Sequence, residues 1–388
     1  MRSTSRSERY FATCPRGLEG VLAAELGPLG AAHIAITDGG VGFQGDARVA
    51  YRANLHSRVA SRILWSVCSG SYRNEDDIYR ALRVFDWEAH FDVGRTLRVD
   101  VSAIRSPLKS LDFLTLRIKD AVCDRFRDAA GTRPSVDTAR PDVRIHAFLT
   151  SAQFTVYLDT SGEALFKRGY RSDANEAPVR ENLAAGIVRL SGWTAEEALF
   201  DPMCGGATFL VEAASMALGV PPGAKREFGF EKLRSYDPAL WKSVKDEAAL
   251  NQPPAALQLF GSDRSARALE SARLNLSAAG LGAMVQLAHA DVLAVNPPAP
   301  SGVLVMNPPY GVRTEDRDRL AEFYPKLGDA LKRRFAGWRA HIFTADLRLP
   351  KLIGLSPSRR IPLFNGALEC RLYEFRIVAG SMRKKREE

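Results

Sequence analysis

The chain of 388 residues has few cysteines and no long apolar run, and both shortages exclude whole classes of protein. Its five cysteines form no C-x-x-C pair, and its six histidines fall at no metal-ligand spacing around them. We therefore expect neither a disulfide framework nor a metal site. The longest apolar runs, such as RILWSVC and GVLVM, are far shorter than the roughly 20 residues that cross a bilayer, so no membrane segment is expected.

The N-terminal stretch MRSTSRSER is basic and contains serines, but no continuous apolar segment of signal-peptide length follows it. This pattern predicts a frayed end and a cytoplasmic protein. Internal repeats and low-complexity tracts are also lacking. Since no stretch indicates an association surface, a monomer is the default expectation.

Positive charge is what the chain has in excess. The formal net charge is +9 and the pI is near 9.4, which favours a polyanionic partner, because Lys and Arg supply sequence-independent affinity for phosphate. We expect the segment 381–388, which ends in RKKREE, to be a solvated tail, and a contact with RNA is the less favoured alternative.

The first part of the chain alternates short strands and helices of mixed α+β type. RYFATC and RTLRVDVSAI are typical of strands, AHIAITDGGVGFQG of a hairpin around Gly39 and Gly40, and Ser110 is placed to cap the helix that follows it. The pattern predicts small sheets layered by helices, in one segment at 1–60 and a second at 61–162.

Residues 163–182 are polar and rich in turn formers, so we expect a linker there. From 183 to 380, short continuous apolar runs (ALFD, LQLFGSD, VQLAHAD, GVLVMN and AHIFTAD) alternate with helical patterns. Strands that are apolar on both faces and separated by helices predict an α/β domain whose parallel sheet is covered on both sides. RRIPLFNG and ECRLYEFRIV, joined by a short turn, predict an antiparallel edge.

Polar signatures follow three of these strands, at the edge where ligands bind in open α/β sheets. In LFDPMCGGATFLVEAA, Asp201 closes a strand, while Gly205 and Gly206 allow a tight turn close to a ligand. Asp263 is placed to accept hydrogen bonds from ribose hydroxyls, and Asp291 from an adenine amino group. Taken singly, such a glycine pair can be a simple turn and each aspartate a helix cap. The distance from the glycines to the next acidic strand end argues against a nicotinamide dinucleotide.

The tetrapeptide NPPY follows GVLVM. The amide oxygen of Asn307 and the carbonyl of Pro308 provide two rigid acceptors, which a planar amino group on a nucleobase needs. Tyr310 can stack on an extruded base. The same tripeptide at Asn296 has no aromatic residue after it and is interpreted as an ordinary turn.

Five stretches carry a family resemblance: DPMCGGAT, GSD, NPPYG, YPKLGDALKRRFAGW and PLFNGALECRLYEF. They resemble the class I S-adenosylmethionine-dependent RNA methyltransferases that follow a THUMP domain, especially the bacterial large-subunit rRNA guanine-N2 methyltransferases. The resemblance is close along 163–380. Before that, the chain is similar to a ferredoxin-like segment plus THUMP, which implies an RNA-binding N-terminal part and a Rossmann-like C-terminal domain.

The resemblance also implies roles for single residues. Asn307 would border both the cofactor and the target base. The methionine side of the cofactor would be lined by Asp201, Cys204, Gly205 and Gly206, flanked by Arg180 and Asn182; Asp263 would bind its ribose and Asp291 its adenine; and Asn307, Pro308, Pro309 and Tyr310 would hold the base. One position departs from the family, which reads Gly-Ser-Gly-Thr where this chain has Gly-Gly-Ala-Thr. A methyl group at Ala207 is expected to crowd the cofactor unless its φ is negative.

The leading hypothesis is therefore methyl transfer from S-adenosylmethionine to the N2 amino group of a guanosine in structured RNA, with 23S rRNA as the expected partner. A guanine in tRNA, adenine N6 or a glutamine side chain would offer the same kind of planar amine. A non-catalytic RNA-binding assembly factor, disabled at Ala207, is the alternative from another class. The candidates for RNA contact are Arg105, Lys109, Lys119 and Arg127, although a single residue of this kind is more often a solvated surface charge than an RNA contact.

Overall fold

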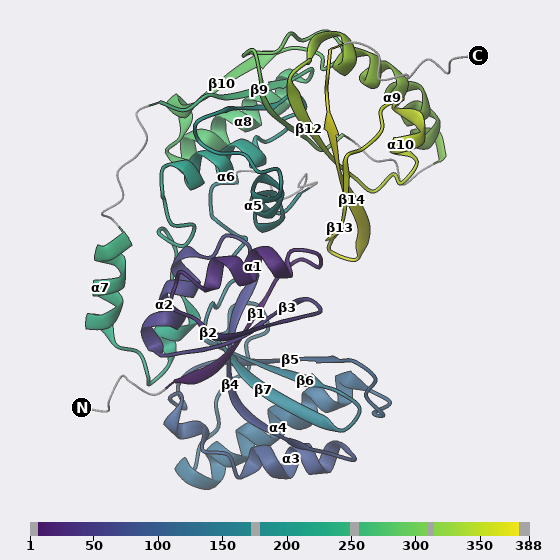
Figure 1. The fold of residues 1–388 in the computed structure, drawn as a ribbon. Coiled ribbons are helices and arrows are strands. Elements are labelled where there is room, and N and C mark those ends of the chain that lie inside the picture. The colour runs from purple at the N-terminus through teal and green to yellow at the C-terminus, as the bar shows by residue number, and fades with distance from the viewer. Residues whose placement is uncertain (1–6, 172–178, 249–255, 309–313, 380–388) are drawn as a thin grey trace. The chain divides into compact units, whose positions relative to one another are not determined.

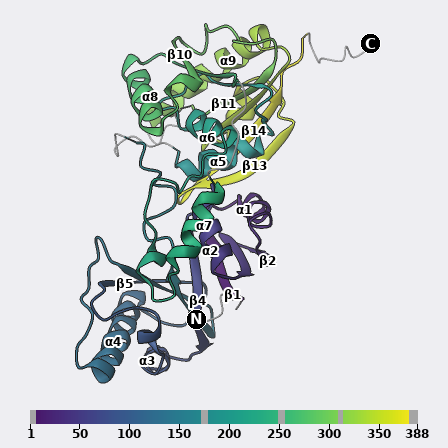
Figure 2. The same ribbon diagram turned by 90° about the vertical axis from the view of Figure 1, so that its left-hand side faces the viewer.

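The computed structural model describes residues 7–171, 179–248, 256–308 and 314–379 (Figures 1 and 2). The chain forms two compact units. The first unit consists of the described residues within 1–14, 22–167 and 222–249. The second consists of those within 15–21, 168–221 and 250–388. The segment from 222 to 248 thus packs in the first unit, whereas the sequence predicts a continuous methyltransferase domain from 183 to 380.

The first unit contains a seven-stranded sheet in the order β2-β3-β1-β4-β7-β6-β5. The strands are β1 (Glu8–Thr13), β2 (Ala32–Thr37), β3 (Gly40–Gly45), β4 (Arg62–Ser71), β5 (Leu97–Ala103), β6 (Val143–Leu149) and β7 (Gln153–Asp159), and the helices along this part of the chain are α1 (Glu19–Leu26), α2 (Ala47–His56), α3 (Glu75–Arg83), α4 (Leu111–Ala130) and α7 (Pro238–Ala248). Strand β4 pairs with β1 on one side and β7 on the other. The two small folds expected at 1–60 and 61–162 therefore share one continuous sheet.

Helices α3 and α4 lie side by side on one face of this sheet (Figures 1 and 2). Strand β6 alternates strictly between buried and half-buried residues, as expected for a strand with one covered face. Its buried residue Ile145 joins a core with Ile118 and Phe126 of α4. As predicted, Ser110 caps α4, with its Oγ accepting a hydrogen bond from the backbone N–H of Phe113 at 3.1 Å.

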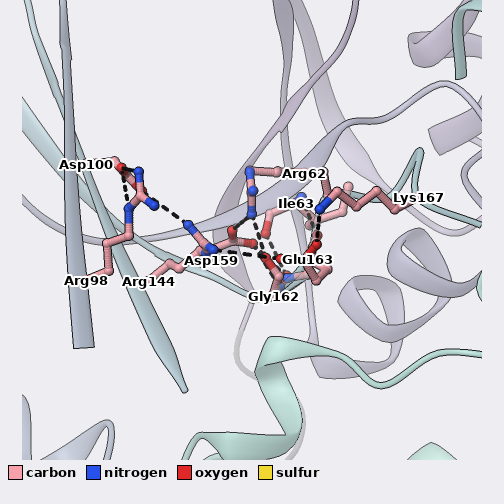
Figure 3. A network of polar contacts seen from close by, with 12 residues as sticks. Arg62, Ile63, Arg98, Asp100, Arg144, Asp159, Gly162, Glu163 and Lys167 are labelled. Atoms are coloured by element: carbon pink, nitrogen blue, oxygen red, sulfur yellow. Dashed lines mark hydrogen bonds and ion pairs between the residues drawn. The ribbon is translucent and has the colours of Figure 1, made fainter. Parts of the chain in front are cut away.

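The opposite face of β5 and β6 carries a group of ion pairs (Figure 3). Arg98 pairs with Asp100 at 2.7 Å, and Arg144 lies 3.6 Å from the same carboxylate. At the end of β7, the buried carboxylate of Asp159 pairs with Arg62. Burial raises the pKa of Asp159, and the guanidinium of Arg62 opposes that rise. A charge so deeply buried persists only when it is paired in this way.

The second unit contains a seven-stranded sheet in the order β10-β9-β8-β11-β12-β14-β13. Its strands are β8 (Ala198–Asp201), β9 (Leu259–Asp263), β10 (Val285–His289), β11 (Gly302–Met306), β12 (Trp338–Thr344), β13 (Arg359–Asn365) and β14 (Leu368–Arg376), and its helices are α5 (Glu181–Leu190), α6 (Thr208–Ala217), α8 (Ala266–Ala279), α9 (Thr314–Arg334) and α10 (Leu349–Leu352). The first five strands of the order are parallel to their neighbours, and β14 and β13 are antiparallel. This confirms the predicted parallel sheet with an antiparallel edge.

Helices cover both faces of the second sheet, as the continuous apolar runs predict. Helix α9 packs on one face, where Tyr324 and Leu327 meet Leu304 and Met306 of β11, while α5, α6 and α8 cover the other (Figure 1). All five residues of β11 are buried. The strand order reverses between β8 and β11, which makes the carboxyl ends of these two strands the topological switch point. Among the described residues, no helix combines the length and apolar character needed to cross a membrane.

Candidate active site

A pocket of about 700 Å³ lies at the switch point of the second unit. Three parts of this unit form its walls: the turn after β8, the residue after β11, and one side of α8 together with Arg171 and Val179. The lining residues are Arg171, Val179, Asp201, Met203, Cys204, Gly205, Gly206, Thr208, Phe209, Ser265, Arg267, Ala268, Glu270, Ser271, Leu274, Asn275 and Asn307. Five of the sequence-predicted site residues, namely Asp201, Cys204, Gly205, Gly206 and Asn307, thus line one pocket.

Asp201 ends β8 with its side chain almost wholly buried, at 1% exposure. Its Oδ1 accepts a hydrogen bond from the backbone N–H of Met203 at 3.1 Å. Burial, helped by the nearby carboxylate of Asp263, raises the pKa of Asp201 to about 8. Burial and the same two carboxyl groups raise the pKa of the Cys204 thiol. Cys204 is therefore a neutral thiol near pH 7, and a neutral thiol is a poor nucleophile.

The glycine turn after β8 is held by its neighbours. Gly205 has a φ of +51°, which favours glycine, and its backbone N–H donates to Oδ2 of Asp263 at 3.0 Å. The carbonyl of Gly206 accepts from Nδ2 of Asn275 in α8 at 2.9 Å. A Cβ at Gly206 would lie 2.9 Å from that same nitrogen, so a side chain at this position would push the Asn275 amide aside.

Ala207 follows with a φ of +61° and forms the N-cap of α6. Only three non-glycine residues in the described part of the chain have a positive φ, and the left-handed conformation costs an L-residue roughly 1–2 kcal/mol. The methyl group of Ala207 is fully buried and does not line the pocket. Burying one methyl returns about 0.8 kcal/mol, which offsets only part of that cost. Since Ala207 lies outside the pocket lining, its methyl group does not narrow the pocket.

The two Asn-Pro-Pro tripeptides differ in what their asparagine oxygens bind. Oδ1 of Asn296 is exposed and accepts from Nη1 of Arg334 at 2.9 Å. Oδ1 of Asn307 is buried at the pocket and has no hydrogen-bond partner among the described residues. A buried acceptor without a partner costs free energy unless something supplies a donor. Pro308 is buried beside it, while Pro309 and Tyr310 lie outside the described residues.

Four of the predicted cofactor residues do not line the pocket. The carboxylate of Asp263 accepts from Gly205 and, at 2.9 Å, from the backbone N–H of Ser265. Asp291 lies two residues beyond β10, where its Oδ1 accepts from the backbone N–H of Leu293 at 2.8 Å. Two more stand at the start of α5: Arg180, which is exposed, and Asn182, which is fully buried. Their assigned contacts with the cofactor stay predictions.

The sequence interpretation missed two parts of the pocket wall. Arg171, which lies in the expected linker, donates from Nη2 to the carbonyl of Val179 at 2.6 Å and to Oγ1 of Thr208 at 3.1 Å. Its Nε lies 3.0 Å from Oε1 of Glu181. The second missed part is the side of α8 formed by Arg267, Ser271 and Asn275. Their i, i+4, i+8 spacing places polar residues on one face of a helix, a signal that could have indicated this wall.

The four candidates for RNA contact lie in the first unit and differ in their pairing. Lys119 pairs with Asp120 at 2.7 Å, and Arg127 with Asp124 at 2.8 Å. Arg105 and Lys109 are exposed in the loop between β5 and α4, and neither has an ion pair among the described residues. Arg105 and Lys109 are therefore the better placed of the four to meet a phosphate.

A sheet of this strand order, with a glycine turn after its first strand and a polar pocket at the switch point, defines a class I methyltransferase-like domain. The chain belongs to the RMKL-like methyltransferase family, whose domain model matches residues 168–374. Models of the RlmL ferredoxin-like domain and of the THUMP domain match residues 9–64 and 72–159. The fold class and the family resemblance predicted from the sequence are confirmed.

Curated relatives carry the description "Ribosomal RNA large subunit methyltransferase K/L". The protein from Aeromonas hydrophila is 39% identical over 401 aligned residues, which cover 98% of this chain and 56% of that protein. The protein from Syntrophotalea carbinolica is 40% identical over 382 residues, covering 95% and 54%. This chain thus spans about half the length of the curated relatives it matches.

Several solved structures are similar along nearly the whole chain. SMU.472, solved in complex with SAH (S-adenosylhomocysteine), has a TM-score of 0.87 at 29% identity, covering 97% of this chain and 100% of that one. A predicted N6-adenine-specific DNA methylase from Listeria monocytogenes has a TM-score of 0.86 at 27% identity, covering 96% and 97%. TrmN from Thermus thermophilus, at 18% identity and a TM-score of 0.70, covering 96% and 100%, shows a shared fold alone.

Proposed function

We propose that this chain transfers a methyl group from S-adenosylmethionine to the exocyclic N2 of a guanosine in 23S rRNA. The curated relatives are named as large-subunit rRNA methyltransferases, the structurally similar SMU.472 carries SAH, and a THUMP domain precedes the methyltransferase domain. Such a substrate implies a cytoplasmic enzyme.

The observation that carries the proposal is the unpaired, buried Oδ1 of Asn307 in the wall of the pocket. An amino group of a base would give this oxygen the donor that it lacks among the described residues. The carbonyl of Pro308 would accept the second hydrogen, because two fixed acceptors orient a planar amine. Tyr310 would stack on the base.

The pocket fits S-adenosylmethionine by the chemistry of its wall. The glycine turn leaves the backbone accessible, and the N-terminus of α6 at Thr208 favours a carboxylate such as that of the cofactor's methionine. When bound, the cofactor supplies an electrophilic methyl on a sulfonium. We assign the contacts as follows from the resemblance. The methionine moiety would be lined by Asp201, Cys204, Gly205 and Gly206 and flanked by Arg180 and Asn182. Asp263 would contact the ribose and Asp291 the adenine.

The test is to incubate purified protein with radiolabelled S-adenosylmethionine and 23S rRNA, and then to separate the nucleosides after digestion. We expect label in N2-methylguanosine. Label confined to N6-methyladenosine would overturn the guanine assignment and support the second candidate, adenine N6 methylation. That candidate is favoured by the description of the similar Listeria structure. Parallel reactions with total tRNA and with assembly intermediates of the large subunit test the choice of RNA.

Calorimetry with SAH tests the rival hypothesis of a non-catalytic assembly factor. The reason for that rival was the methyl group of Ala207, which the structure places outside the pocket. We expect SAH to bind the full chain. Absence of binding at millimolar SAH would support an RNA-binding factor without catalysis.

A further inference from the structure

Both ends of one peptide bond in the glycine turn are held by hydrogen bonds. The carbonyl of Gly206 accepts from Nδ2 of Asn275 at 2.9 Å, and the N–H of Ala207 donates to the carbonyl of Cys204 at 2.7 Å. These two groups belong to the same planar unit. The orientation of that unit sets the φ of Ala207 at +61°, in the left-handed region that L-residues disfavour.

The alternative orientation of this peptide would relieve the strain. Rotating the unit by about half a turn changes φ at Ala207 by about the same angle, into the negative range that an alanine prefers. The same rotation breaks both hydrogen bonds. Gly206 lines the pocket, so the two orientations present different backbone groups there. The two orientations would therefore differ in strain and in hydrogen bonding.

We propose that Asn275 is a positioning residue of the cofactor pocket, whose side-chain amide locks the Gly206–Ala207 peptide in its strained orientation. This inference rests on the proposed function in so far as the pocket takes S-adenosylmethionine. Asn275 is 5% exposed and reaches the turn from α8. The contact is close, since a Cβ added at Gly206 would lie 2.9 Å from Nδ2 of Asn275. The other bond of this peptide goes to the carbonyl of Cys204, within the turn itself, so Asn275 is the side chain that holds it from α8.

The lock predicts a coupling between Asn275 and Ala207. Removing the donor, as in Asn275→Leu, frees the carbonyl of Gly206 and lets the strain at Ala207 drive the peptide into the other orientation. A glycine at 207 has no such strain. The Asn275 substitution should therefore do less harm in the Ala207→Gly background than in the native one.

Calorimetric titration of the full chain with SAH measures this coupling. We expect Asn275→Leu to weaken SAH binding about three- to ten-fold, the size of one hydrogen bond, and by less than about two-fold in the Ala207→Gly background. Arg273→Ala, an exposed change on the same helix, is the matched control and should bind as the native chain does. Asn275→Asp, which keeps the size but loses the donor, replaces Asn275→Leu if that variant does not fold. An equal loss of SAH affinity in the two backgrounds, or no loss in either, would rule out this role of Asn275.

Hydrogen exchange of the free protein gives a readout that needs no cofactor. The amide of Ala207 should exchange faster in Asn275→Leu than in the native chain, with unchanged exchange in the strands of the second unit. If the native chain binds no SAH, the proposed function fails, and hydrogen exchange at the Ala207 amide still tests the role of Asn275. If SAH binds and both Ala207 exchange and SAH affinity are unaffected by Asn275→Leu, the lock alone fails.

Discussion

The backbone N–H of Gly205 donates a hydrogen bond to Oδ2 of Asp263 at 3.0 Å. The other oxygen of this carboxylate accepts from the backbone N–H of Ser265 at 2.9 Å. A single side chain thereby joins the glycine turn after β8 to the start of α8 after β9. Asp263 therefore shapes the pocket whether or not it also contacts a ribose.

Replacing Asp263 by alanine should weaken SAH binding at least about ten-fold, since two hydrogen bonds to a charged group are lost and each contributes roughly 1.5–3 kcal/mol. Asp263→Asn should lose less because one acceptor oxygen remains. Calorimetry gives the affinities, and thermal unfolding of each free variant shows whether the fold persists. Native affinity in a folded Asp263→Ala variant would contradict this role.

Asn307→Ala should abolish measurable turnover, with a loss of at least about a hundred-fold, because the amine would no longer be aimed. RNA affinity should stay within a few fold, since phosphate contacts supply most of it. Methyl incorporation into rRNA and filter binding measure the two effects. The matched control is Asn296→Ala, in the other Asn-Pro-Pro tripeptide, which should leave turnover nearly unchanged. Loss of turnover in the control, or equal loss of turnover and RNA binding in Asn307→Ala, would show that the role is assigned wrongly.

The sequence predicts the parallel sheet and the strand ends of the pocket because both depend on local patterns. Continuous apolar runs mark strands that are covered on both faces, and the polar residue that ends a run must lie at one edge of the sheet. Asp201 and Asn307 follow such runs, and the structure places both in the wall of one pocket. The turn at Gly205 can also be predicted from a local pattern, since its positive φ favours glycine.

The parts that the sequence did not reveal depend on contacts between distant segments. Asn275 belongs to an ordinary amphipathic helix, and only the packing of α8 against the glycine turn makes its amide part of the pocket. Arg171 lies in a polar stretch that has the composition of a linker. The segment from 222 to 248 packs with the first unit although it lies between two strands of the second, which no local pattern records. Ala207 is a fourth example, because its conformation follows from the hydrogen bonds that the Gly206–Ala207 peptide makes with Asn275 and Cys204.

The buried carboxyl of Asp201 should make stability fall with rising pH. Its pKa is raised to about 8 in the folded state, while an unfolded aspartate titrates near 4. Between these values the unfolded state has released a proton that the folded state retains, so the free energy of unfolding decreases from about pH 4 to about pH 8. In Asp201→Asn this contribution is absent. Melting temperatures of both proteins across pH 4–9 should show the native chain losing stability relative to the variant up to about pH 8, and a constant difference across this range would contradict the prediction.

RNA binding should depend on the unpaired cations of the β5–α4 loop more than on the paired ones of α4. Replacing Arg105 and Lys109 by alanine should weaken binding to rRNA and lower the slope of log affinity against log salt by about one for each phosphate contact that is lost. The matched control is the double replacement of Lys119 and Arg127, whose charges are already paired with Asp120 and Asp124. Filter binding at several salt concentrations measures both slopes. A larger change of slope in the control would indicate that RNA binds the exposed side of α4 and not the β5–α4 loop.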